Sequence, residues 1–187
     1  TRLLVGGMER VFEVNRNFRN EGLSRQHNPE FTMIEIYQAY ADYHSMMDLT
    51  EEMICLCAER HGSGTDVKFG DLELCLKRPW RRATYAELLQ EYGGCAKART
   101  LGIEEAGMDD LVVINEVFEA TVEDNLIHPT FVMDYPAALC PLTRRKQDQP
   151  EIAERFELFV AGMELANAYT ELNDPVFVEV GVRVLSR

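Results

Sequence analysis

The 187 residues, 46% of them hydrophobic, suffice for one domain with a substantial core and are too few for two comfortable ones. The formal net charge of −13 argues against a protein that binds nucleic acid through its own surface, because phosphate binding needs clustered Lys and Arg. The sequence contains no apolar run long enough for a membrane-spanning helix and no recognisable signal peptide, so we expect a cytoplasmic protein without a membrane partner.

The cysteines favour reduced thiols over a disulfide framework, because they are odd in number and show no paired spacing; they are Cys55, Cys57, Cys75, Cys95 and Cys140. Cys55, Cys57 and His61 are close in sequence, but helix positions two apart point to nearly opposite sides. We therefore expect ordinary packing at these residues and no metal site.

The first predicted structure is a long β-hairpin. Polar and apolar residues alternate over residues 11–21 and again over residues 30–40, and residues 22–28 supply Gly, Ser and Asn for the loop between them. Ile34 and Ile36 share one face of the second run. We expect both of them to point to the core.

Three helices are predicted downstream of the hairpin. Two of them start with the spacing of a capping box, and the pairs are Asp48 with Glu51 and Thr84 with Glu87. The first helix is expected to run to about Arg60, and the second is expected to end at Gly93. A third helix is expected over about residues 109–127.

Shorter strands complete the pattern; they are expected within residues 66–77, as a small hairpin turning at residues 69–71, and over residues 130–133, 155–160 and 163–172. The last two strands should join at Ala161-Gly162. Hairpins dominate, and no strand–helix–strand unit repeats. The predicted fold class is therefore α+β, an antiparallel β-sheet flanked by helices in a single domain over residues 1–187.

Charged, amide and phenol side chains alternate along three of the predicted strands. Such a face is costly to bury without partners. It therefore lines either a wet cleft that binds a ligand or an outward sheet face with salt bridges between strands, and composition does not decide between the two. The residues are Glu13, Asn17, Arg19 and Glu21 on the first strand, Glu35 and Tyr37 on the second, and Asn167, Tyr169 and Glu171 on the last.

Two basic clusters stand out in this acidic chain. They are Arg144-Arg145-Lys146 and a looser set formed by Arg78, Arg81 and Arg82. A charge run of this kind is usually a solvated loop, so we expect both clusters to face solvent.

Several long runs carry a family resemblance; they are residues 10–21, 27–33, 35–43, 128–131, 134–136, 154–159 and 164–175. The first two resemble motif 2 of class II aminoacyl-tRNA synthetases, and the others resemble the lysine-specific branch of that family. The resemblance extends from Leu3 to Pro175 in the family's order and is weakest over about residues 59–109. It implies a fold of the class II synthetase catalytic-domain type.

The resemblance implies an ATP site built from motif 2. Arg19 matches the arginine that contacts the ATP α-phosphate and the substrate carboxylate, a catalytic role that suits a planar, permanently charged guanidinium. Glu21, His27 and Asn28 match positions around the adenine and the phosphates. Phe31 matches the ring that stacks on adenine.

The resemblance also implies a pocket for L-lysine, whose distant ammonium calls for a carboxylate at fixed depth with a hydroxyl nearby. Glu171 and Tyr37 match that pair. Glu35 matches a residue near the amino-acid substrate, and Asn167 and Tyr169 match positions along its carboxylate and stem. A neutral amino acid would leave the buried acid unpaired, which would penalise the wrong substrate.

Glu157 and Glu164 match carboxylates that hold Mg²⁺ at the ATP phosphates, which suits a hard cation that takes one or two acids plus phosphate oxygens. Glu164 and Asn167 have opposite strand parity. Both can face the site only if the strand contains a bulge or the turn at Gly162 re-aims Glu164.

The reaction implied is adenylation followed by transfer. The lysine carboxylate attacks the α-phosphate of ATP, pyrophosphate leaves, and the lysyl group passes to the terminal ribose of tRNA(Lys). The tRNA would be held mainly by domains absent from this chain, and the full-length protein would be a homodimer.

The chain departs from the family pattern at both ends. Motif 3, a glycine-rich run ending in an ATP-binding arginine, does not follow Pro175, and motif 1 is also unmatched. Residue 1 is Thr rather than Met, and the apolar residues 3–5 read as the inside of a strand, so we expect a partial catalytic core whose gene product starts earlier. Two alternatives stay open: a paralogue that attaches lysine or a lysine analogue to a protein, and a non-catalytic module that binds lysine or an adenylate.

Overall fold

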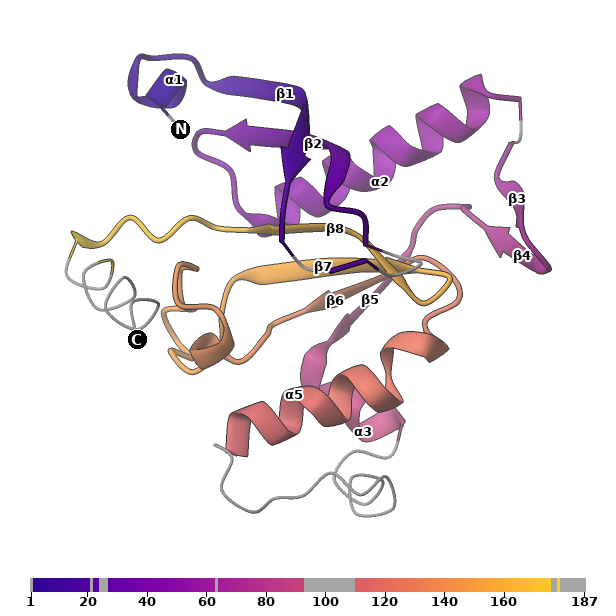
Figure 1. Cartoon of the computed structure of the whole chain (residues 1–187). Helices are drawn as coiled ribbons and strands as arrows, with labels where there is room; N and C mark the ends of the chain where they lie inside the picture. Colours follow the sequence, from indigo (N-terminus) through magenta and orange to yellow (C-terminus); the bar gives the residue numbers. More distant parts are fainter. Residues whose placement is uncertain are drawn as a thin grey trace. The chain divides into compact units, whose positions relative to one another are not determined.

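The computed structural model describes residues 2–20, 22–23, 27–62, 64–92, 110–175 and 178 (Figure 1). The chain divides into two compact units, residues 1–41 and residues 42–187, each with its own architecture. Within the described ranges, no helix is long and apolar enough to cross a membrane.

The first unit is a β-hairpin preceded by a short helix. Its elements are α1 (Arg2–Val5), β1 (Arg10–Phe18) and β2 (Glu30–Gln38). The strands pair antiparallel, with Arg10 opposite Gln38 at one end and Phe18 opposite Glu30 at the other. The predicted hairpin is confirmed.

Two details of the first unit differ from the prediction. Residues 3–5 lie in α1 instead of a strand, and the N–H of Gly6 donates to the carbonyl of Arg2 at 3.1 Å. A short apolar run fits a helix as well as a strand, so its pattern alone does not distinguish them. Ile34 is 43% exposed and Ile36 is half-buried, because a two-stranded hairpin has no second layer of its own to cover that face.

The second unit opens with α2 (Tyr43–Arg60), which begins earlier than its predicted cap at Asp48. Asp42 is the N-cap, and its carboxylate accepts a hydrogen bond from the N–H of Ser45 at 2.8 Å. Asp42 and Ser45 have the spacing of a cap and its third helical residue. The pair lacks the Glu that marks a capping box, so the sequence pattern favours Asp48.

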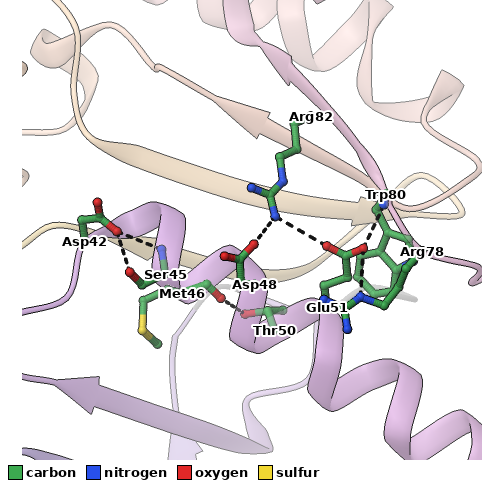
Figure 2. Close-up of polar contacts among 9 residues, drawn as sticks. All are labelled: Asp42, Ser45, Met46, Asp48, Thr50, Glu51, Arg78, Trp80 and Arg82. Atoms are coloured by element: carbon green, nitrogen blue, oxygen red, sulfur yellow. Dashed lines mark hydrogen bonds and ion pairs between the residues drawn. The ribbon is translucent and has the colours of Figure 1, made fainter.

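Asp48 and Glu51 instead lie on the body of α2 and bind arginines that lie in, or just before, the first strand of the main sheet (Figure 2). Glu51 is 2% exposed; one of its oxygens accepts from the N–H of Trp80 at 2.9 Å and lies 3.4 Å from Nε of Arg78. Its other oxygen lies 3.5 Å from Arg82, which also binds Asp48. Arg78 and Arg82 are exposed, as expected, and their guanidinium groups also neutralise this buried carboxylate, because a buried charge requires a partner.

A hairpin and two helices follow; they are β3 (Asp66–Phe69), β4 (Leu72–Cys75), α3 (Tyr85–Glu91) and α5 (Asp110–Thr121), with the 3₁₀ turn η1 (Glu123–Asn125) after the last. β3 and β4 pair around Gly70, whose φ is +60°, as predicted. Thr84 and Glu87 form the predicted capping box. The third helix ends at Thr121, earlier than predicted, because its last turn tightens into η1. Gly93, expected to close α3, lies outside the described residues.

The main sheet has the strand order β5-β6-β7-β8, and its strands are β5 (Arg81–Thr84), β6 (Thr130–Met133), β7 (Arg155–Val160) and β8 (Met163–Tyr169). β5 runs parallel to β6, and the other neighbours pair antiparallel. The predicted turn at Ala161-Gly162 joins β7 to β8, with φ of 55° and 71° as in tight hairpin turns. The α+β class is confirmed, and the sheet is mixed because of β5, which the sequence pattern misses.

Two hydrophobic clusters cover the two faces of this sheet. Adjacent residues of β6 point to opposite faces, so Phe131 belongs to the cluster with α2 and Val132 belongs to the cluster with α3 and α5. Figure 1 shows α2 on one side of the sheet and α3 and α5 on the other. On β8, Ala166 packs against the α2 cluster, so its neighbour Asn167 faces the opposite way. Glu157, which pairs with Asn167, lies on that second face as well.

Candidate active site

In the first unit, Arg19 and Phe31 meet at the loop end of the hairpin. Arg19 follows β1 directly, and its N–H donates to the carbonyl of Pro29 at 3.0 Å. Its guanidinium carbon lies over the Phe31 ring, 5.5 Å from the centroid, in cation–π geometry. The hairpin therefore brings together two residues that the sequence assigns to ATP.

The other residues assigned to ATP belong to the hairpin loop. His27 and Asn28 are exposed just before β2. Glu21 lies outside the described residues. Their roles around the adenine and the phosphates stay predictions.

The polar face of the hairpin sets two carboxylates opposite each other. Glu13 pairs with Glu35 across the strands, and the side-chain amide of Asn15 donates to Glu13 at 2.8 Å. Tyr37, two residues beyond Glu35, shares that face. Like charges that face each other directly across two strands are destabilising.

On β8, a bulge brings Glu164 and Asn167 together. Glu164 lies opposite Phe159 and Ala166 lies opposite Leu158, so the pairing shifts by one residue between them. The extra residue resolves the conflict of strand parity, because both polar side chains now point to one face. The amide Nδ2 of Asn167 donates to Glu164 at 2.6 Å. Of the two alternatives that the sequence left open, a bulge or a re-aimed turn at Gly162, the structure contains the bulge.

Glu157 of β7, opposite Asn167, is held by two donors. The hydroxyl of Tyr135 donates to one carboxylate oxygen at 2.7 Å, and the guanidinium of Arg155 binds the other. Arg155 also lies over the Tyr135 ring, 5.3 Å from its centroid. Burial raises the pKa of Glu157; the Arg155 charge opposes this shift and the Glu164 carboxylate adds to it. Sequence reasoning did not assign Tyr135 or Arg155, although both lie in runs that match the family.

Glu123 of η1 adds a further carboxylate, which the sequence did not single out because one Glu at a helix end carries no signal. Burial, together with repulsion from Glu119, Glu157 and Glu164, raises the pKa of Glu123 to about 7. Acids that raise one another's pKa form a setting that a divalent cation relieves. In the part of the chain that the structure describes, no three His, Cys, Asp or Glu side chains could hold a metal ion alone. A cation at Glu157 and Glu164 would therefore need further oxygens, such as those of phosphates.

Glu171 lies just beyond β8 and is exposed. It forms an antiparallel bridge with Thr143, whose side chain is buried. Asn167, Tyr169 and Glu171 alternate along the chain, so the polar face of β8 continues to Glu171. Tyr169 is 40% exposed on this face.

The predicted site residues therefore form two sets, one in each unit. The hairpin carries Arg19, His27, Asn28, Phe31, Glu35 and Tyr37, and the main sheet carries Glu157, Glu164, Asn167, Tyr169 and Glu171. Each set contains at least one carboxylate and one phenol. The hairpin set adds a cation–π pair, and the sheet set adds the acidic cluster.

Comparison with known proteins gives a consistent match. Residues 1–184 match the model of the family described as tRNA synthetases class II (D, K and N). The chain is 52% identical over 188 residues to the lysine–tRNA ligase of Moorella thermoacetica, 49% identical over 188 residues to that of Carboxydothermus hydrogenoformans and 50% identical over 188 residues to that of Magnetococcus marinus. These matches cover 93–94% of this chain and 38% of each relative. The chain thus spans well under half the length of these relatives.

Proposed function

Because this chain belongs to the family of class II tRNA synthetases (D, K and N), we propose that it is the lysine-binding part of a lysine–tRNA ligase. In that enzyme, L-lysine and ATP form lysyl-adenylate and pyrophosphate, and the lysyl group then passes to tRNA(Lys). The observation that carries this proposal is the polar face of β8, where Glu164, Asn167 and Tyr169 follow one another on one side, and which Glu171 continues just beyond the strand.

The lysine pocket needs a carboxylate for the ammonium and polar groups along the stem. Glu171, at the exposed end of the β8 face, would accept the ammonium, and Tyr37 would supply a hydroxyl. Asn167 and Tyr169 would line the substrate's carboxylate and stem, and Glu35 would lie near the amino acid. Ornithine is one methylene shorter, so its ammonium would fall short of Glu171 and would not form the ion pair that lysine forms there.

The ATP site would use the charge and the ring that meet in the hairpin. Arg19 would bind the α-phosphate and the lysine carboxylate as negative charge moves between them. The Phe31 ring would stack on the adenine. The cation–π contact holds the Arg19 guanidinium beside that ring. Glu21, His27 and Asn28 would contact the adenine and the phosphates.

In the adenylation step, an oxygen of the lysine carboxylate forms a bond to the α-phosphorus of ATP. The bond from that phosphorus to the bridging oxygen breaks, and the electron pair leaves with pyrophosphate. The chain needs no nucleophile of its own, because orientation and charge neutralisation lower the barrier.

Glu157 and Glu164 would hold Mg²⁺ together with phosphate oxygens of ATP. When bound, the ion supplies neutralisation of the phosphate charge. Tyr135 and Arg155 hold the Glu157 carboxylate in one orientation, as partners of metal ligands commonly do. The acidic setting on this face fits a divalent cation.

The full-length protein would meet tRNA(Lys) mainly through regions outside this chain, because a chain with a net charge of −13 repels phosphates overall. We expect a homodimer in the cytoplasm, without a membrane partner.

The lysine pocket is tested by calorimetric titration of the protein with L-lysine, ornithine and norleucine. We expect lysine to bind and the other two to bind at least tenfold more weakly, because neither places an ammonium at Glu171. Glu171→Gln should remove this preference. Glu59→Gln, which makes the same change at an exposed position of α2, should keep it. Equal binding of lysine and norleucine by the wild-type protein would contradict the proposal.

A further inference from the structure

Glu171 is not part of β8, and the segment of residues 142–146 determines where its backbone lies. The N–H of Leu172 donates to the carbonyl of Leu142 at 3.2 Å, and the N–H of Arg144 donates to the carbonyl of Thr170 at 2.9 Å. Between these two bonds, Thr143 bridges Glu171. A shift of this segment would therefore move the backbone of Glu171 with it.

The same segment is paired on its other side. The N–H of Glu154 donates to the carbonyl of Arg144 at 2.9 Å, and the N–H of Lys146 donates to the carbonyl of Ile152 at 2.9 Å. The N–H of Thr170 donates to the carbonyl of Glu154 at 2.9 Å. Backbone hydrogen bonds thus join the segment of residues 142–146 to residues 170–172 on one side and to residues 152–154 on the other. Side-chain contacts add to these bonds.

A series of side-chain contacts also links Lys146 to Thr170. The ammonium of Lys146 lies 2.6 Å from one oxygen of Asp134, and the hydroxyl of Tyr43 donates to the other oxygen at 2.9 Å. The N–H of Tyr43 donates to the hydroxyl of Thr170 at 3.2 Å. Thr170 is therefore linked to residues 144–146 in two ways. One is the backbone hydrogen bond with Arg144, and the other is the series of contacts through Tyr43 and Asp134 to Lys146.

These contacts are sheltered from solvent. The side chains of Lys146 and Asp134 are 24% and 14% exposed, and Tyr43 is 2% exposed. Charge-assisted hydrogen bonds are shorter and stronger than neutral ones, and shelter reduces their screening. Asp134 is also held in the left-handed region at φ 61°, a conformation that persists where the surroundings determine it. Lys146, which the sequence places in a solvated basic cluster, is therefore a structural partner of the site.

We infer that Lys146, Asp134 and Tyr43 form a positioning group that fixes the depth of the Glu171 carboxylate and thereby sets the preference for lysine over shorter amino acids. The inference rests on the proposed lysine pocket. It adds three residues that touch no substrate and act through the backbone of residues 170–172.

The first test removes the charge of Lys146 and keeps its length, as Lys146→Met, in the protein used for lysine-dependent ATP–pyrophosphate exchange. We expect the KM for lysine to rise about tenfold and the KM for ATP to stay within about twofold of wild type. The preference for lysine over ornithine should fall, and Lys146→Arg should restore it. Arg81→Met is the matched control, because it breaks an exposed ion pair with Glu91 that has no link to Glu171.

A second variant, Tyr43→Phe, keeps the buried ring and deletes only the hydroxyl bonded to Asp134. Hydrogen exchange then measures, without any ligand, how readily the backbone hydrogen bonds of residues 170–172 open. Exchange at the N–H of Leu172 should speed up in Tyr43→Phe and Lys146→Met, and stay as in wild type in Arg81→Met.

Different results would overturn the lysine pocket and the positioning group. Wild-type protein that does not distinguish lysine from ornithine would overturn the proposed pocket and, with it, the selectivity assigned to the positioning group. Unchanged Leu172 exchange and an unchanged KM for lysine in both variants, with wild-type selectivity for lysine, would overturn the positioning group alone.

Discussion

Glu51 should contribute strongly to the stability of the fold because of its environment. Its carboxylate is 2% exposed and is bound by the N–H of Trp80 and the guanidinium groups of Arg78 and Arg82. We predict that Glu51→Ala lowers the free energy of unfolding by about 2–3 kcal/mol, because it strands a buried donor and leaves two arginines facing a cavity. Urea denaturation measures this loss.

The control at the same scale is Glu91→Ala, which removes an exposed partner of Arg81. An exposed pair of this kind contributes less than about 1 kcal/mol. If the two substitutions cost the same, the Glu51 cluster would not be the anchor between α2 and the start of the main sheet that its burial indicates.

Single residues also show what the sequence could and could not predict. Arg19, Phe31, Glu164 and Asn167 were found from motifs, and the structure brings them together in pairs within each unit. Tyr135, Arg155 and Glu123 were not assigned, because their importance comes from long-range contacts with Glu157 and not from a local pattern; they gather only once the sheet and η1 are in place.

At the scale of elements, α2 depends on a cap that the sequence pattern places six residues too late. Asp42 accepts from the N–H and the hydroxyl of Ser45, whereas Asp48 lies within the helix and binds Arg82. We predict that Asp42→Ala lowers the free energy of unfolding by about 1 kcal/mol. Asp48→Ala should cost less, because its ion pair is exposed. A larger loss in Asp48→Ala would contradict this assignment of the cap.

The cap also has a pH dependence. The hydrogen bonds from Ser45 lower the pKa of Asp42 below its ordinary value of 3.8. A carboxyl group with a lower pKa in the folded state adds stability that is fully present above the unfolded pKa and is lost as the pH falls through the folded pKa. The difference between wild type and Asp42→Ala in urea denaturation should therefore be constant above about pH 5 and shrink below about pH 4.

Other elements show why some of the fold was predictable. The β1–β2 hairpin, the α3 capping box and the β7–β8 turn follow from local alternation, caps and turn residues. β5 has four residues that begin with two arginines, so its pairing with β6 comes from tertiary contacts that no local pattern reveals. The β8 bulge was considered, as one of two alternatives, only because Glu164 and Asn167 were assigned to one site.

At the scale of the whole molecule, the chain has two compact units, each carrying one set of predicted site residues. The expectation of a single domain over residues 1–187 stays a prediction, as do the roles of the individual site residues. The chain spans 38% of the length of the relatives that it matches. Motif 2 is matched in the sequence and motifs 1 and 3 are not, and we propose that this chain contributes to lysine activation.

Lysine-dependent ATP–pyrophosphate exchange by the purified protein, with its intact mass recorded on the same sample, tests that claim most directly. The account predicts exchange that requires lysine, that ornithine and arginine do not support, and that Arg19→Ala abolishes. Folded protein of the correct mass that binds lysine without any exchange would contradict an enzymatic role and favour a non-catalytic lysine-binding module.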